Sequence, residues 1–194
     1  LEGTSPLKDK LGKKVFDSGL SLWDDALQDY RLGSSPCDDE GAPSQRLPLI
    51  TKGTASAFFY DLQTAALAGV RSTGGGRRAG ATGQVKPGMS SLVIEKGEVS
   101  FQDMVENMKE GLVVEQLLGA DQGNVLGGEF GGNVLLGYKV ENGEIVGRVK
   151  DTMIAGNIYQ ALQGGLGIGS ETRWVDGTLL TPYLYCPAVS VSAK

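Results

Sequence analysis

The sequence predicts an α+β protein, in which a mainly antiparallel β-sheet built from hairpins is accompanied by a few short helices. Three observations predict this class. The 194 residues include 30 glycines and only 7% aromatic residues, a composition that favours tight turns. Short β-prone runs lead directly into turn glycines, as hairpin strands do. Helix-capping residues precede only short apolar segments.

A recurring unit supports the hairpins. Each copy is a β-prone run, a turn glycine and an aspartate eight residues later, at 49–61 and 138–151, with a looser copy at 92–99. The pair Asn142-Gly143 is a strong hairpin signal, because both residue types tolerate the positive φ of a type I′ turn. The repetition suggests an internal duplication, and chance similarity between short hairpins is the alternative.

The first predicted helix covers 62–68. Asp61 can cap its N-terminus, and Gly69 supplies the left-handed residue that ends it. A third helix is expected after Asn157, because Gly156 weakens a start further upstream at Asp151.

The second predicted helix begins after Ser100, which forms a capping-box pattern with Asp103. It ends before Gly111 and presents one apolar stripe, which we assign to the core. The stripe consists of Phe101, Met104, Val105 and Met108.

The chain contains no histidine, and its two cysteines, Cys37 and Cys186, lie far apart in sequence. Imidazole is the usual general base near neutral pH and the commonest metal ligand. The usual catalytic mechanisms of serine, cysteine and zinc hydrolases therefore lack a required residue, histidine. We assign no catalytic and no metal-binding residue, and we expect a binding or scaffold domain. Cys186 is interpreted as a packed strand cysteine.

Composition excludes several partners. The net charge of −5 and the pI near 4.8 argue against nucleic acid, which needs clustered Lys and Arg. No apolar run approaches the roughly 18 residues of a membrane span, and no secretory signal pattern occurs at the start. The glycine clusters match neither nucleotide-binding fingerprint. We expect a cytoplasmic protein without a membrane segment.

Several polar groups are candidates for chemistry or contact. The acidic groups Asp24-Asp25 and 38–41 offer carboxylates, but their spacing does not fit a calcium loop, and turn roles are favoured. Arg77 and Arg78 form the only dense cluster of basic residues in the sequence. The cluster is interpreted either as an anion-binding site or as a solvent-exposed loop. Together with Glu129 and Phe130 they are nominated as substrate or partner contacts.

An ordered series of short segments resembles the C-terminal half of the TldD/PmbA family across residues 1–194, taken as one domain. The segments are 5–12, 38–41, 60–61 with 64–65, 72–78, 110–114, 141–145 and 154–157. Residues 5–7 and 60–62 look more like the PmbA (TldE) type.

The resemblance implies a cytosolic proteolytic system, historically labelled a modulator of DNA gyrase, that processes small unfolded peptides. Its zinc-bearing TldD type carries two histidines upstream of the resembling region and a cysteine near the C-terminus; around 169–172 this chain has no cysteine. The PmbA type lacks the metal. The resemblance therefore implies zinc only in a histidine-bearing partner, and a homodimer or a heterodimer with such a TldD-like subunit.

We hypothesise that the chain is the non-catalytic part of such a system. A glycine-rich antiparallel sheet can present an open strand edge to which an unfolded peptide adds through main-chain hydrogen bonds. Two alternatives remain: a purely structural dimerisation domain, and a stand-alone hydrolase that uses carboxylates such as Asp39 and Glu40.

Overall fold

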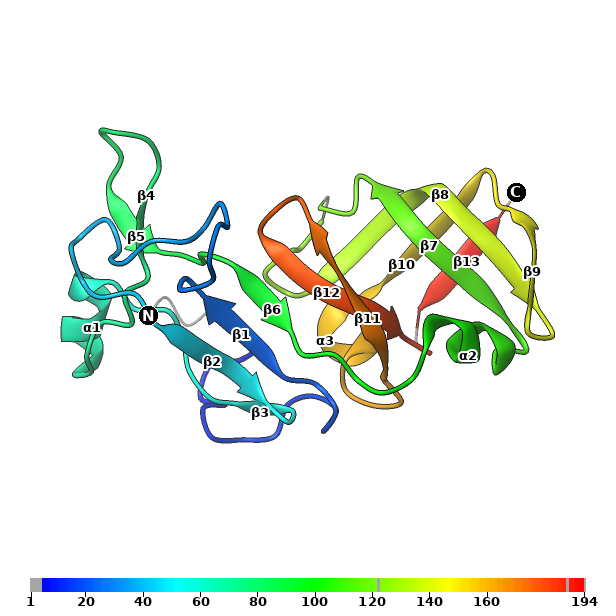
Figure 1. The fold of residues 1–194 in the computed structure, drawn as a ribbon, viewed down its shortest axis with the longest axis horizontal. Coiled ribbons are helices and arrows are strands. Elements are labelled where there is room, and N and C mark those ends of the chain that lie inside the picture. Colours follow the sequence, from blue (N-terminus) through cyan, green and yellow to red (C-terminus); the bar gives the residue numbers. More distant parts are fainter. Residues whose placement is uncertain (1–4, 122, 188, 194) are drawn as a thin grey trace. The chain divides into compact units, whose positions relative to one another are not determined.

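The computed structural model describes residues 5–121, 123–187 and 189–193. These residues form short helices and mainly antiparallel strands (Figure 1), so the predicted α+β class is confirmed. The chain divides into two compact units. Among the described residues, unit 1 holds 9–95 and 172–182, and unit 2 holds 5–8, 96–171 and 183–193. No helix in the described ranges has the length and apolar character needed to cross a membrane.

Unit 1 is built on a six-stranded sheet in the order β11-β12-β6-β1-β2-β3. Strand β12 pairs parallel with β6 at Leu179 and Leu180, whereas β1, β2, β3 and β6 pair antiparallel with one another. The strands are β1 (Leu22–Asp25), β2 (Arg46–Thr51), β3 (Thr54–Ala55), β6 (Leu92–Ile94), β11 (Gly167–Val175) and β12 (Leu179–Tyr185). Strands β11 and β12 contribute residues to both units.

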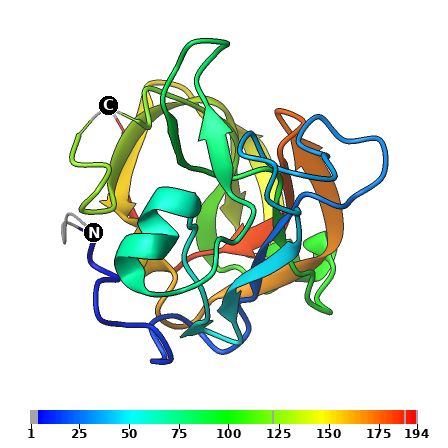
Figure 2. The same ribbon diagram turned by 90° about the vertical axis from the view of Figure 1, so that its left-hand side faces the viewer.

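A separate two-stranded hairpin of unit 1 pairs β4 (Gly76–Arg78) with β5 (Val85–Pro87). Helix α1 (Leu62–Ala68) lies near the base of this hairpin (Figure 2). The predicted helix ends are confirmed: the Asp61 carboxylate accepts from the Thr64 N–H at 2.6 Å, and Gly69 closes the helix with φ 68°.

Unit 2 is organised around its longest strand, β8, in the middle of a curved sheet (Figure 1). Strand β7 pairs along one edge of β8, while β10 and β9 share the other edge, and β13 pairs with β10. The strands are β7 (Glu110–Leu118), β8 (Glu129–Glu141), β9 (Glu144–Arg148), β10 (Thr152–Asn157) and β13 (Ser190–Ala193). Val105, Val113 and the fully buried Val140 form the centre of its core.

The two helices of unit 2 begin where the sequence predicts. Helix α2 (Phe101–Glu106) is capped by Ser100, and α3 (Ile158–Ala161) is capped by Asn157, the later of the two starts considered. Helix α2 is shorter than expected and ends at Asn107. The chain must turn here because the next residues pair with β8 from Glu110 onward.

Two copies of the recurring unit form left-handed hairpin turns. Asn142 and Gly143 have φ of 49° and 84°, and Lys52 and Gly53 have φ of 46° and 77°, the signs of a type I′ turn. The third copy, 92–99, is a strand end and not a hairpin, because β6 pairs with β1 and β12. An internal duplication stays a hypothesis.

The turn at Gly143 provides a test of the fold of unit 2. A Cβ at this position would lie 2.7 Å from the Glu106 carbonyl oxygen and would be held at positive φ. We expect Gly143→Ala to lower the free energy of unfolding by about 1–3 kcal/mol. Gly147→Ala is the matched control, since nothing lies within 4 Å of a Cβ there. Equal urea-unfolding midpoints for the two variants would contradict the account.

Candidate functional site

Unit 2 contains a cavity of about 410 Å³ with a predominantly apolar lining, which we call the apolar groove. Its walls come from five places in the chain. They are residues 101, 104, 105 and 108 of α2 and the turn after it, residues 110–114 of β7, Phe130 and Ile154 of β8 and β10, and residues 183–187, 189 and 191. The stripe at 101, 104, 105 and 108, which the sequence assigns to the core, also borders this space. Val105 is buried in the core of unit 2, and Phe101 and Met108 pack against it.

Strand edges, and not only sheet faces, border this groove. Successive side chains of a strand point to opposite faces, yet every residue of 110–114 and of 183–187 contributes to the lining. In the described residues, β7 pairs only with β8. Along 110–114, the second edge of β7 therefore has no strand partner in the described part of the chain, and this edge borders the groove.

Aromatic and polar contacts brace the groove. The Tyr183 hydroxyl donates to Glu115 Oε1 of β7 at 2.8 Å. The rings of Phe101 and Tyr183 lie 4.5 Å apart between centroids. The Phe101 N–H donates to Glu171 Oε2 at 3.1 Å. These contacts connect Tyr183 to β7 and α2, and the start of α2 to β11.

The charged lining residue of the groove is Glu110, which is exposed at its rim. It lies opposite Glu141 in the β7–β8 register. Lys139 relieves this like-charge pairing: it contacts Glu141 at 2.5 Å. That hydrogen bond is the main cause that raises the pKa of the Lys139 ammonium, with smaller contributions from the charges of Glu141 and Glu110. The groove thus has an apolar interior and one carboxylate, Glu110, in its lining.

Cys186 belongs to the groove wall, directly after the end of β12 and not inside the strand. Burial raises the pKa of its thiol, because a thiolate is poorly solvated among apolar groups. Such a thiol is a weak nucleophile and a weak metal ligand at neutral pH. Cys37, in unit 1, is exposed.

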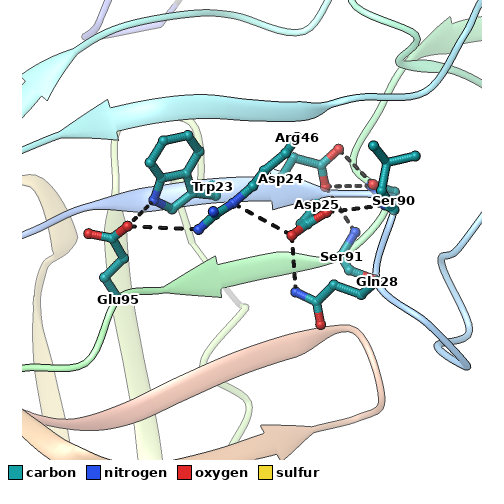
Figure 3. Close-up of polar contacts among 9 residues, drawn as sticks. Trp23, Asp24, Asp25, Gln28, Arg46, Ser90, Ser91 and Glu95 are labelled. Atoms are coloured by element: carbon teal, nitrogen blue, oxygen red, sulfur yellow. Dashed lines mark hydrogen bonds and ion pairs between the residues drawn. The ribbon is translucent and has the colours of Figure 1, made fainter.

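The carboxylates Asp24 and Asp25 do not form a paired site (Figure 3). As neighbours in β1 they point to opposite faces. The buried Asp24 accepts hydrogen bonds of 2.7–2.9 Å from Ser90 N and Oγ and from Ser91 N. Asp25 lies 3.6 Å from Arg46. Both carboxylates hold the sheet together.

Arg46 is the centre of the second cluster in Figure 3. Its guanidinium lies 4.3 Å from the centre of the Trp23 ring and 3.8 Å from Glu95. The Trp23 indole N–H donates to the same Glu95 oxygen at 2.7 Å. The charge of this half-exposed arginine is thus balanced by Asp25 and Glu95, which gives it a structural role in the sheet.

The acidic loop 38–41 is also structural. Asp38 is buried and accepts from the N–H groups of Glu40, Ala42 and Gly76. Asp39 accepts from the Arg78 N–H at 2.7 Å, and Glu40 from the Leu62 N–H at 2.7 Å. The loop therefore fixes α1 and β4 in unit 1. Its carboxylates are committed to backbone donors, which disfavours their use as a catalytic acid and base.

The four nominated contact residues lie in different surroundings. Phe130 lines the apolar groove, and the exposed Glu129 beside it pairs with Asn157 of β10. Arg77 and Arg78 belong to the β4–β5 hairpin of unit 1. The groove residues of β7 were missed as a site. Their signal was the uninterrupted apolar run Leu112–Val114, which is unusual for a strand with one solvent-facing side.

Comparisons with known proteins agree with this fold. Residues 1–193 match the family described as the PmbA/TldA metallopeptidase C-terminal domain. The fold is shared with a Thermotoga maritima protein described as a modulator of DNA gyrase (TM-score 0.87, 32% identity, 98% of this chain and 43% of that one). It is also shared with TldE from Thermococcus kodakarensis (TM-score 0.82, 31% identity, 93% and 41%).

Curated relatives give the same result. A metalloprotease TldD homolog from Buchnera aphidicola is 29% identical over 91% of this chain and 36% of its own length. The metalloprotease PmbA of Escherichia coli O157:H7 is 31% identical over 86% and 35%. The chain belongs to the PmbA/TldA metallopeptidase C-terminal domain family, and it spans between about a third and a half of the length of these relatives.

The described residues do not fit a protease zinc ion. No group of three or more His, Cys, Asp or Glu side chains gathers among them. Structural and catalytic zinc ions need three or four such ligands. Cys186, the thiol near the C-terminal end, lies among apolar groups that keep it protonated. No catalytic step can therefore be derived through zinc from these residues.

The thiols provide a test of the groove's character. Burial raises the pKa of Cys186 above the ordinary value of a cysteine thiol. At a given pH, a smaller fraction of Cys186 is therefore thiolate than of a cysteine with the ordinary pKa. We expect iodoacetamide to alkylate the exposed Cys37 about tenfold faster near pH 8, and the Cys186 rate to keep rising at higher pH. Peptide mapping by mass spectrometry measures both rates, with the urea-unfolded chain as control. Faster alkylation of Cys186 than of Cys37 in the folded chain would contradict a half-buried thiol with a raised pKa.

Proposed function

We propose that this domain binds extended, unstructured peptides for a PmbA/TldD-type proteolytic system. The peptide lies along the unpaired edge of β7 and places an apolar side chain in the groove. One observation carries the proposal: an open strand edge, residues 110–114, runs directly beside a preformed apolar cavity. Strand addition of this kind takes affinity from main-chain hydrogen bonds and selectivity from side-chain pockets.

The cavity suits a short segment better than a folded partner. Its volume of about 410 Å³ lies at the lower end of the roughly 300–1,000 Å³ typical of ligand pockets. Met104 and Met108 form part of the wall. Methionine side chains adapt to ligands of different shape. The domain is thus suited to peptides that share apolar character and not one sequence.

Peptide cleavage is assigned to a partner. The chain has no histidine, and the described side chains do not assemble a zinc site. We therefore propose that a histidine-bearing, TldD-like subunit carries the zinc, and that this domain contributes to a homodimer or to a heterodimer with that subunit. The names of the relatives, metalloprotease TldD homolog and metalloprotease PmbA, support a metalloprotease system as the setting.

Two alternatives account for the structure less well. A purely structural dimerisation domain has no use for a preformed groove beside an unpaired strand edge. A stand-alone hydrolase needs carboxylates free to exchange protons, whereas Asp39 and Glu40 both accept hydrogen bonds from backbone N–H groups.

A binding experiment tests the proposal. We expect an unstructured peptide rich in leucine and phenylalanine to bind the wild-type chain, as followed by fluorescence anisotropy. Met104→Glu should weaken binding at least about tenfold, because it places an unpaired charge in an apolar site. The control is Val146→Glu, on the exposed strand β9 outside the groove, which should leave the affinity unchanged.

A second peptide separates main-chain from side-chain recognition. The same sequence, N-methylated at alternate residues, keeps its side chains but loses backbone donors. We expect it to bind far more weakly than the parent. Equal affinity of the two peptides, or an equal effect of the two variants in chains whose circular dichroism is unchanged, would rule out strand addition at the groove.

A further inference from the structure

The register of β7 determines which of its residues turn their main-chain groups toward the open edge. In an antiparallel ladder, opposed residues alternate between pairs that are hydrogen-bonded to each other and pairs that are not. The Asn142 N–H donates to the Lys109 carbonyl oxygen at 2.8 Å, so the 109–142 pair is hydrogen-bonded. By alternation, the next pair, Glu110 and Glu141, is not hydrogen-bonded.

The hairpin turn leads to the same assignment by a separate route. Glu141 and Glu144 close the two-residue turn at 142–143. Residues that close such a turn direct their main-chain groups toward each other, so those of Glu141 point to β9 and not to β7. The β7–β8 register is regular from 110 to 114. Glu110, Leu112 and Val114 therefore turn their N–H and C=O groups to the edge that borders the groove.

The same register assigns the side chains of a peptide strand added at this edge. Directly opposed residues project from the same face of a sheet. Val113 packs with Val105 of α2 in the core of unit 2, and both also line the groove. Gly111 shares that face, because it lies two residues before Val113. Peptide residues opposite Gly111 and Val113 therefore project into the groove. A Cβ on Gly111 would meet the Met108 side chain, so a flexible methionine borders the first of these positions.

A peptide residue opposite Glu110 meets a charged environment on the other face. Glu110 lies opposite Glu141, and Glu141 lies opposite Glu144, so three glutamates form one row across β7, β8 and β9. Lys139 pairs with Glu141 at 2.5 Å. Within the described ranges, Glu110 and Glu144 take part in no recorded ion pair. Lys109 precedes the strand, and alternation places its side chain on the opposite face. Like charges directly opposite each other destabilise a sheet, so a cation beside Glu110 would relieve repulsion.

Strand direction decides the order in which a peptide meets these positions. The ladders that β8 forms with its neighbours, and the β10–β13 ladder, are all antiparallel. Antiparallel pairs are slightly more stable per residue than parallel ones. An antiparallel peptide first presents an apolar side chain opposite Val113 and then an outward-facing one opposite Leu112. Its next two side chains are apolar, opposite Gly111, and basic, opposite Glu110.

We infer that the open edge of β7 selects peptide segments of the pattern apolar-any-apolar-basic, read from the N-terminus, and that Glu110 is the residue that selects the lysine or arginine. This inference rests on the proposed function, because it names the peptides that the same edge takes. Glu110 suits this role because it is exposed, belongs to the edge strand and lines the groove. The apolar positions supply affinity, whereas the charge fixes direction and register.

The test measures fluorescence anisotropy of rhodamine-labelled peptides with the full chain. The parent peptide is Gly-Ser-Leu-Ser-Leu-Lys-Ser-Gly, a second peptide carries glutamate in place of lysine, and a third is the parent sequence in reverse order. We expect the parent to bind about fivefold more tightly than the glutamate peptide at low ionic strength, as befits an exposed cross-strand charge pair. The difference should shrink as salt is added. The reversed peptide should bind more weakly than the parent.

Four variants identify the residue responsible. Glu110→Lys should reverse the preference, so that the glutamate peptide binds more tightly than the parent, and Glu110→Gln should bring the two affinities close together. Glu144→Lys changes the net charge as much as Glu110→Lys does, but it lies two strands from the edge, so the preference should persist. Met104→Glu, in the groove, should weaken the binding of all three peptides at least about tenfold.

The outcomes separate this inference from the proposed function. Equal affinity of the lysine and glutamate peptides for the wild-type chain would overturn the inference while peptide binding stands. Equal changes of preference in Glu110→Lys and Glu144→Lys would do the same. A reversed peptide that binds as tightly as the parent would contradict the antiparallel order of the pattern. Failure of every peptide to bind would contradict the proposed function, and the inference with it.

Discussion

The pairing of β8 is the constraint on which unit 2 depends. One edge of this strand is taken by β7, and the other edge is shared between β10 and β9. Because both edges of β8 are hydrogen-bonded to other strands, β7 is an edge strand of this sheet. An open edge is a hazard that proteins usually cover or blunt. Here it lies beside an apolar cavity, so main-chain groups and an apolar pocket are available to the same ligand.

Several local features maintain that arrangement. The left-handed turn at Asn142 and Gly143 sets the register of β8 and β9. Backbone bonds from both turn residues to Lys109 and Met108 then tie the turn to the segment between α2 and β7. The same short hairpin therefore orders the sheet and positions one wall of the groove. In unit 1 the acidic loop 38–41 has the comparable role for α1 and β4.

Much of the local structure was predictable from the sequence because its causes are local. Asp61, Ser100 and Asn157 cap helices through their own side chains, and Asn142-Gly143 adopts the turn that its residue types allow. The groove was not predictable, because it depends on the approach of residues 110–114 to residues 183–187, which are far apart in sequence. The role of the carboxylates was not predictable either. In the sequence, Asp39 and Glu40 are two neighbouring carboxylates that could act as a catalytic acid and base. Only the fold shows that both accept hydrogen bonds from backbone N–H groups of residues distant in sequence.

The account rests on β7 accepting a further strand, and amide hydrogen exchange tests this most directly. Exchange in the chain is compared with and without a saturating unstructured apolar peptide. The account predicts slower exchange at alternate amides within residues 111–114, which face the groove, while β9 on the far side of β8 is unchanged. A bound peptide that leaves the exchange of 111–114 unaltered would contradict it.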